Sequence, residues 1–157
     1  MTGWSNLLRS LKHSTDKPVE AVIKGEIPKW LSGTLFRNGP GRFEFGDQSY
    51  KHVFDGSACV HKFQINNGNC MYSNKLLETK SYNKMVKENK LLPAFGTDNI
   101  DISLFGRLKS FVNPPDYQDN VNVNVVPYAN NQLYALTEVL LFINFICEFF
   151  LKTFFFR

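Results

Sequence analysis

Three histidines and three cysteines are the side chains in this sequence that could most readily bind a metal or act as nucleophiles. The histidines are His13, His52 and His61. Imidazole is a common ligand of transition metals, but these three residues lie in segments of different character. We therefore expect no metal site made from them, and we expect His52 and His61 to have structural, hydrogen-bonded roles.

The cysteines indicate a reduced, intracellular thiol chemistry. Cys59, Cys70 and Cys147 are an odd number and form no CxxC pair. This spacing argues against a disulfide framework and against a structural zinc site. The sequence therefore favours free thiols in a cytoplasmic protein.

Composition narrows the class of protein. Hydrophobic residues make up 43% of the chain, which excludes a disordered tail, and the aromatic share of 15% favours strands or a lipid-facing surface. The net charge is +4, but the basic residues are scattered and form no nucleic-acid-binding motif. We expect weak attraction to anionic surfaces and no nucleic-acid partner.

The first part of the chain is predicted to be a lead-in followed by short strands. Residues 1–20 are typical of a helix or an irregular segment that ends near Pro18. Segments 34–37 and 42–45 read as short strands, separated by a turn at residues 38–41.

Two strand pairs follow from alternation of residue types. Residues 60–65 and 70–75 flank an Asn- and Gly-rich turn and predict a hairpin. Residues 119–126 place Val121, Val123 and Val125 on one face, which predicts a strand, and a second strand is expected at 132–137.

Two other segments leave alternatives open. Residues 79–92 are rich in lysine and are compatible with a helix or a solvated surface loop. Residues 100–112 carry a helical stripe that fits either core packing or a basic amphipathic helix at a membrane surface. The stripe comprises Ile100, Leu104, Phe105, Leu108, Phe111 and Val112.

The last part of the chain differs from what precedes it. Residues 139–157 lose the alternation and most of the charge, and the apolar run 139–151 is shorter than the roughly 20 residues that cross a bilayer. We expect three regions: a lead-in at 1–20, a β-rich part at 21–138, and an unrelated hydrophobic tail at 139–157 that does not continue the preceding sheet.

Six segments, in order, resemble the carotenoid cleavage oxygenase family, in the animal branch that includes the retinal pigment epithelium isomerase. The resemblance covers about residues 20–138. The segments are Gly25 to Gly41 (GEIPKWLSGTLFRNGPG), His52 to Gly56 (HVFDG), His61 to Phe63 (HKF), Ala94 to Thr97 (AFGT), Asp119 to Val123 (DNVNV) and Tyr134 to Glu138 (YALTE).

The resemblance implies an all-β fold, namely part of a seven-bladed β-propeller with short helical cap segments. Seven four-stranded blades need on the order of 280 residues. A chain of 157 residues can supply about two or three blades' worth of strands. We therefore expect a truncated propeller.

The resemblance also implies a chemistry: an Fe(II)-dependent dioxygenase that cleaves a carotenoid double bond to apocarotenals such as retinal. In the family four histidines hold the iron, and none of them matches a histidine of this chain. Thr137 and Glu138 match residues close to the iron, and Glu138 corresponds to a carboxylate that orients a ligand histidine. We expect no tight Fe(II) binding and no activity from the chain alone.

The sequence departs from the family in two places. After Glu138 the family pattern stops. The Pro-Asp-Pro-Cys segment that precedes the membrane-contacting stretch in this branch is absent, since residues 98–103 read DNIDIS. Leu104, Phe105, Leu108 and Phe111 still fit a substrate-entry rim or a membrane patch. The alternative function is a non-catalytic, lipid- or membrane-associated fragment; the expected location is cytoplasmic, with peripheral membrane contact or a mitochondrial location left open.

Overall fold

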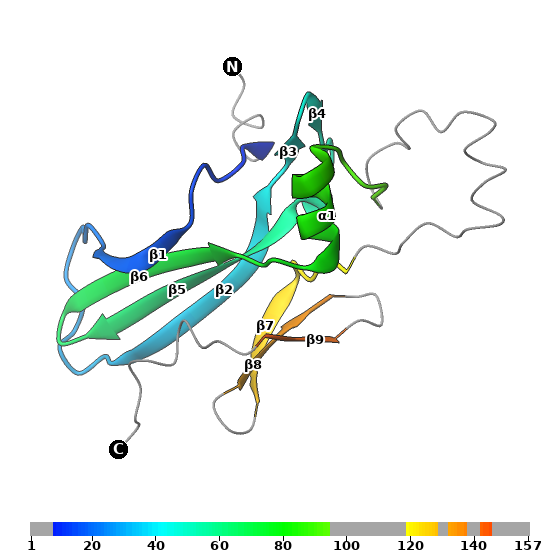
Figure 1. The fold of residues 1–157 in the computed structure, drawn as a ribbon. Coiled ribbons are helices and arrows are strands. Elements are labelled where there is room, and N and C mark those ends of the chain that lie inside the picture. The colour runs from blue at the N-terminus through cyan, green and yellow to red at the C-terminus, as the bar shows by residue number, and fades with distance from the viewer. Residues whose placement is uncertain (1–7, 95–118, 129–131, 138–141, 146–157) are drawn as a thin grey trace, which may run out of the picture.

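The computed structural model describes residues 8–94, 119–128, 132–137 and 142–145. These residues form three sheets and two short helices (Figure 1). The elements in chain order are β1 (Thr15–Glu20), β2 (Gly33–Arg42), β3 (Glu44–Phe45), β4 (Gln48–Ser49), η2 (Val53–Asp55), β5 (Ser57–Asn66), β6 (Asn69–Leu76), α1 (Lys80–Glu88), β7 (Asn124–Tyr128), β8 (Gln132–Leu136) and β9 (Phe142–Phe145). The described part of the chain is thus mostly β-structure.

The first sheet is antiparallel and has the strand order β1-β6-β5-β2. Its central hairpin, β5 and β6, is the one predicted from the alternation at residues 60–75. Asn67 and Gly68 connect the strands with φ values of 46° and 83°. Asparagine and glycine adopt this left-handed region at low cost, which explains why the turn forms at this dipeptide.

Strand β2 corrects the prediction of two short strands with a turn at residues 38–41. It is one continuous strand from Gly33 to Arg42, and Gly39 and Pro40 pair with Cys59 and Ala58. Because β2 is at the edge of its sheet, a proline is tolerated there. The register shifts between Pro40 and Arg42, so the glycine-rich stretch produces a bulge rather than a turn.

Strand β1 corrects the prediction of a helix or irregular lead-in for residues 15–20. Thr15 pairs with Asn74 and Val19 with Tyr72, with an irregular register between them. All its residues after Thr15 are exposed. The strand has no buried face, so its sequence lacks the apolar alternation that would reveal it.

Residues 79–92, for which a helix or a loop was considered, contain helix α1. The Thr79 side chain accepts a hydrogen bond from the Tyr82 amide at the N-terminus, and Asn89 ends the helix in a left-handed conformation with φ of 50°. Only Ser81 and Met85 of this helix are buried. Its lysine-rich face is solvated, as expected.

The second sheet has the order β7-β8-β9. The predicted strand at 132–137 is confirmed as β8, which pairs with β7 on one side and with β9 on the other. The expectation that residues 139–157 do not continue this sheet is wrong for residues 142–145, because β9 pairs with β8 from Leu133 to Leu136. The boundaries of the three regions otherwise stay a prediction.

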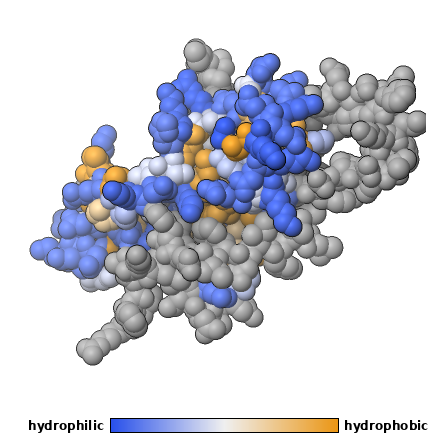
Figure 2. All heavy atoms as spheres, viewed as in Figure 1, coloured by the Kyte–Doolittle hydropathy of each residue, from blue (hydrophilic) through white to orange (hydrophobic). Residues whose placement is uncertain are grey.

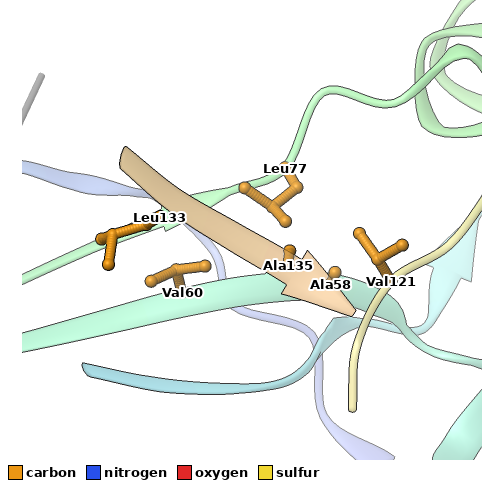
Figure 3. Packing of buried hydrophobic residues seen from close by; sticks show 6 residues of the cluster. All are labelled: Ala58, Val60, Leu77, Val121, Leu133 and Ala135. Carbon is orange, nitrogen blue, oxygen red and sulfur yellow. The ribbon is translucent and has the colours of Figure 1, made fainter. Parts of the chain in front are cut away.

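A hydrophobic core lies between the sheet β1-β6-β5-β2 and the sheet β7-β8-β9. Leu133 and Ala135 on β8 pack against Ala58 and Val60 on β5 (Figure 3). Leu77 and Val121 complete this cluster of buried side chains, and Ala58, Val60, Val121 and Ala135 are at most 1% exposed. The second sheet therefore covers one face of the first.

A second core lies beneath α1. Helix α1 and the β3–β4 hairpin share this cluster, which consists of Phe43, Phe45, Tyr50, Met85 and Leu91. The Tyr50 hydroxyl donates a hydrogen bond to the Leu92 carbonyl at 3.0 Å. This cluster fixes the chain on either side of the long strands β5 and β6.

The edge strands of the two large sheets, β2 and β7, lie side by side (Figure 1). A β-propeller repeats four-stranded antiparallel sheets around a central channel, so that neighbouring sheets pack face to face and their inner edge strands lie close together. The described residues thus have the predicted fold class, a mostly β, partial propeller.

Candidate functional site

Of the site residues that the resemblance predicts, the structure describes Thr137. It directly follows β8 and is half-buried. The alternation along β8 buries Leu133 and Ala135, and Thr137 is the next position of the same period. Glu138 lies outside the described residues, as do Leu104, Phe105, Leu108 and Phe111.

The position of Thr137 depends on how the segment before β7 is held. Residues 119–123 were predicted to be the start of a regular strand, but the strand begins only at Asn124. Val121 is fully buried whereas Val123 is 49% exposed, so the valines do not share one face. The prediction of a strand is therefore wrong for residues 119–123.

The asparagine side chains of this segment replace the missing ladder hydrogen bonds. Asn120 accepts a hydrogen bond from the Ala58 amide at 2.9 Å and donates one to the Gly56 carbonyl at 2.9 Å. Asn122 donates to the carbonyls of Phe54 and Gly56, both at 2.8 Å. We call Asn120 and Asn122, with the main chain of residues 54–58 that they bind, the amide clamp.

Two further residues extend this attachment on either side. Asn38 on β2 donates hydrogen bonds to the carbonyls of Val121 and Asn124, so it joins the inner edge strands of both sheets. Asp119 accepts hydrogen bonds from the Lys80 and Ser81 amides at 2.8 and 2.9 Å, at the first turn of α1. Residues 119–124 are therefore anchored to β2, to the start of β5 and the segment before it, and to α1.

Asp119 is negatively charged over a wide pH range. Partial burial raises the pKa of its carboxyl group, but hydrogen bonds from Ser81, Thr79 and Lys80 outweigh that effect and leave the pKa below its ordinary value. A carboxylate at a helix N-terminus also interacts favourably with the helix dipole. This charge therefore stabilises the attachment of the segment to α1.

Close contacts at Gly56 explain why the clamp needs a glycine there. A Cβ atom on this residue would lie 2.6 Å from the Phe43 ring and 2.7 Å from the Pro40 side chain. The backbone conformation itself is ordinary, with φ of −60°. Gly56 is thus required by the closeness of its neighbours, and its carbonyl accepts hydrogen bonds from both asparagines of the clamp.

His52 and His61 have hydrogen-bonded roles, as predicted. His52 Nδ1 accepts a hydrogen bond from the Phe54 amide and caps η2. His61 Nδ1 lies 2.7 Å from the Tyr72 hydroxyl. Burial, and then the positive charge of Arg37, lower the pKa of His61.

Among residues 8–94, 119–128, 132–137 and 142–145, no three His, Cys, Asp or Glu side chains gather in a way that could hold a metal ion. The described residues therefore do not fit the iron site that the resemblance implies.

Cys59 is fully buried, and desolvation raises the pKa of its thiol to about 11, so it is a poor nucleophile. No helix among the described residues is long and apolar enough to span a membrane.

Sequence reasoning missed Asn38, Asn120 and Asn122 as positioning residues. All three lie in segments that carry the family resemblance. The available signal was the polar character of Asn120 and Asn122 within a predicted strand next to a buried valine. Buried amides need hydrogen-bond partners, but the partners lie 62 to 68 positions away in the sequence.

Known proteins resemble this chain in both sequence and structure. The family model described as retinal pigment epithelial membrane protein matches residues 8–145. Carotenoid isomerooxygenase of Galleria mellonella is 35% identical over 136 residues, which cover 83% of this chain and 26% of that protein. Beta,beta-carotene 15,15'-dioxygenase of Rattus norvegicus is 38% identical over 130 residues, which cover 78% and 22%.

The similarity extends to solved structures. The crystal structure of cobalt-substituted Synechocystis apocarotenoid oxygenase superposes with a TM-score of 0.68 at 31% identity. The superposition covers 86% of this chain and 27% of that one. The chain spans about a quarter of the length of the curated relatives it matches. It belongs to the retinal pigment epithelial membrane protein family, whose matched members are carotenoid oxygenases.

Proposed function

We propose that this chain supplies the N-terminal part of an iron-dependent dioxygenase that cleaves a carotenoid double bond to apocarotenals such as retinal. The observation that carries the proposal is the family match over residues 8–145, which includes the amide clamp and Thr137. The relatives named above act on carotenoids by their names, and they support a carotenoid or retinoid as the substrate class.

In this proposal, residues of this chain lie near the iron, whereas the residues that bind the iron lie outside this chain. The sequence has three histidines, of which His52 and His61 are engaged in the hydrogen bonds described above. We therefore propose that the chain alone binds no Fe(II) tightly and is inactive. Thr137 and Glu138 are the residues that we assign to the surroundings of the iron in a complete enzyme.

A chimera tests this assignment. Residues 8–137 would replace the matching segment of the rat dioxygenase, and cleavage of β-carotene would be followed by chromatography. We expect the chimera to form the product of the rat enzyme, because the clamp would place the residue at position 137 as in its relatives. A folded chimera that forms no product would contradict the proposal.

Variants of the chimera separate the site from the scaffold. Thr137→Ala is expected to change the rate of cleavage because we assign Thr137 to the iron surroundings. Val86→Ala serves as the matched control, since Val86 lies on the exposed face of α1 and is 46% exposed. Equal activity of the two variants would remove Thr137 from the proposed site.

A separate observation supports a second candidate function, that of a non-catalytic lipid- or membrane-associated protein. Hydrophobic residues gather at the left end of the molecule, where Figure 1 places the connection between β1 and β2 (Figure 2). In that connection Val22 is 93% exposed and Trp30 is 81% exposed. Exposed aliphatic and tryptophan side chains favour the interface between water and lipid. We propose peripheral membrane contact of a cytoplasmic protein through this connection.

Flotation with liposomes tests the second candidate. We expect the wild-type chain to float and the double variant Val22→Ser/Trp30→Ser to stay in the dense fraction. Val86→Ser is the control for general loss of exposed apolar surface, and it should float like the wild type. A wild-type chain that does not float with neutral or anionic lipid would exclude this function.

A further inference from the structure

The sequence contains two Asn-Gly dipeptides, Asn38-Gly39 and Asn67-Gly68. Asparagine is one of the thermolabile residues of proteins. An asparagine that precedes glycine is especially labile, because the glycine nitrogen can attack the carbonyl carbon of the asparagine side chain without hindrance from a Cβ atom. The structure places the two dipeptides in different surroundings, so we expect them to react at different rates.

Asn38 is held in the middle of strand β2. Its main chain pairs with Val60, which is fully buried. Its side-chain amide donates hydrogen bonds to the carbonyls of Val121 and Asn124. The side chain can therefore meet the nitrogen of Gly39 only if the pairing of β2 with β5 and the attachment to residues 121–124 are both broken.

Asn67 lies at the tip of the β5–β6 hairpin, at one end of the first sheet (Figure 1). It is exposed and left-handed, and the pair formed by Asn66 and Asn69 closes the turn. Gly68 is not crowded, since a Cβ atom there would meet the Ile27 carbonyl oxygen at an ordinary contact distance of 3.5 Å. Opening of the turn therefore needs to break no more than the last pair of the ladder.

The exposure of this tip follows from its place in the sheet. Sheet packing in a propeller covers the faces of a blade, as β8 covers the face that carries Ala58 and Val60. The β5–β6 turn lies beyond the ends of its strands, and connections of this kind generally run at the protein surface. A further blade on the other face of the first sheet would therefore leave the tip accessible.

Local opening controls the reaction at both dipeptides. Ring closure requires the glycine nitrogen to approach Cγ of the asparagine, and neither the left-handed backbone of Asn67 nor the strand backbone of Asn38 brings these atoms together. The rate then follows the population of locally opened chain, because opening and closing are fast relative to the chemical step. A hairpin tip opens at a low free energy, whereas a paired strand at a core opens only at a high one.

We propose that Asn67 is a site of spontaneous deamidation in the folded chain. The Gly68 nitrogen forms a bond with Cγ of Asn67, its proton goes to the departing amide nitrogen, and ammonia leaves. Water then opens the cyclic imide at either of its two carbonyls, so the product at position 67 is aspartate or isoaspartate. Water is the sole co-reactant, and the proposal is independent of the proposed enzymatic role.

The two products should affect the hairpin differently. Aspartate, like asparagine, adopts the left-handed region at low cost, so it should preserve the turn. Isoaspartate carries the main chain through the side-chain carbons and lengthens the two-residue turn by one atom. Because loop length sets the register of a hairpin, the pairs that Asn66 forms with Asn69 and Ile65 forms with Cys70 should weaken.

Peptide mapping tests the proposal, with Asn38 as an internal control. The 157-residue chain would be incubated at physiological temperature and pH, in buffer and in urea, and mass spectrometry would follow the conversion of both asparagines. In buffer we expect Asn67 to convert at least about tenfold faster than Asn38, because its opening costs less. In urea neither asparagine is protected, so the two rates should become similar.

A second measurement separates the two products. Deamidation lowers the net charge of +4 by one, so ion exchange isolates the deamidated chain. A methyltransferase specific for isoaspartyl groups, supplied with S-adenosylmethionine, then labels the isoaspartate form. We expect this form to unfold at a lower temperature than the Asn67→Asp variant, which should unfold close to the wild type.

Three outcomes would overturn the inference. One is a folded chain in which Asn67 converts no faster than Asn38. Another is a chain in which both rates are the same in buffer as in urea, which would show that the fold does not control the reaction. The third is an isoaspartate form that unfolds together with Asn67→Asp, which would contradict the expected effect on the turn.

Discussion

Two neighbouring regions of this molecule are attached to the rest in different ways. The β5–β6 hairpin is held by a regular ladder of main-chain pairs from Cys59 and Leu76 to the turn. Residues 119–123, which lead into β7, are held mainly by the side chains of Asn120 and Asn122 and by the Asp119 carboxylate, beside a main-chain bond from Val123 to the Leu136 carbonyl. The first region was predicted from its sequence and the second was not.

The difference between these two regions shows which kind of structure an alternation of polar and apolar residues can predict. An alternating pattern predicts a main chain that pairs with its neighbours, and it assumes that polar side chains face water. In the amide clamp the polar side chains point to buried main-chain groups, since Asn122 is only 7% exposed. The second sheet, and Thr137 at its end, are thus positioned by side-chain chemistry rather than by strand pairing.

The largest expected effect comes from removing the clamp. Asn120→Ala/Asn122→Ala leaves the Gly56 and Phe54 carbonyls and the Ala58 amide without partners, which should lower the free energy of unfolding by about 3–5 kcal/mol. Urea denaturation measures the loss, and hydrogen exchange should show β8 amides losing protection before those of β5 and β6. Asn83→Ala, an exposed asparagine on α1, is the control. Uniform loss of protection would show that the two regions are not attached differently.

A second substitution tests the acceptor side of the clamp. Gly56→Ala forces a methyl group against Phe43 and Pro40 and displaces the shared carbonyl, at a cost of about 2 kcal/mol in the free energy of unfolding. Gly39→Ala is the matched control, because nothing lies within 4 Å of the position that a Cβ atom on Gly39 would take. Thermal unfolding should separate the two variants. Equal stability would mean that the close packing around Gly56 is unimportant.

The attachment to α1 should contribute less. Asp119→Ala removes a carboxylate from the helix N-terminus and should cost about 1–2 kcal/mol at neutral pH. Since the folded pKa of Asp119 lies below its ordinary value of 3.8, this stability is fully present above pH 3.8 and is lost as pH falls through the folded pKa. Unfolding curves of the variant and the wild type should therefore converge in acid. A gap that persists there would assign the effect to packing.

The smallest effect concerns His61 in the ladder-held hairpin. Its folded pKa lies below the ordinary 6.5, so the contribution of the neutral side chain is complete above pH 6.5 and decreases as pH falls toward the folded pKa. Because the side chain is only partly buried, we expect a loss of less than about 1 kcal/mol between pH 7.5 and 5. His61→Gln should reduce this pH dependence. An unchanged slope would place the titration elsewhere.

The sequence alone was sufficient to predict the family, the fold class and those strands that are marked by local sequence patterns. Asn67-Gly68 fixes a turn between two alternating segments, and all of that information lies within a few residues. Strand β1 was missed because it has no buried face and contains Pro18. Strand β2 was divided in two because Gly39, Pro40 and Gly41 usually mark a turn, whereas here they form an edge-strand bulge.

The candidate site could be predicted only in part. Thr137 and Glu138 came from the resemblance and from no feature of spacing or composition. The amide clamp depends on contacts between residues 54–58 and 119–122, which no local pattern contains. Strand β9 was missed because residues 139–145 show no alternation of polar and apolar residues, although residues 142–145 pair with β8 and lie within the family match.

In the function that we propose, this chain supplies part of the framework of a carotenoid oxygenase and none of its iron ligands. The most direct measurement is the iron content of the purified 157-residue chain after anaerobic incubation with Fe(II), together with its turnover of β-carotene. We predict substoichiometric iron and no apocarotenal product. One iron per chain, bound through repeated dialysis and accompanied by cleavage of the carotenoid, would contradict it.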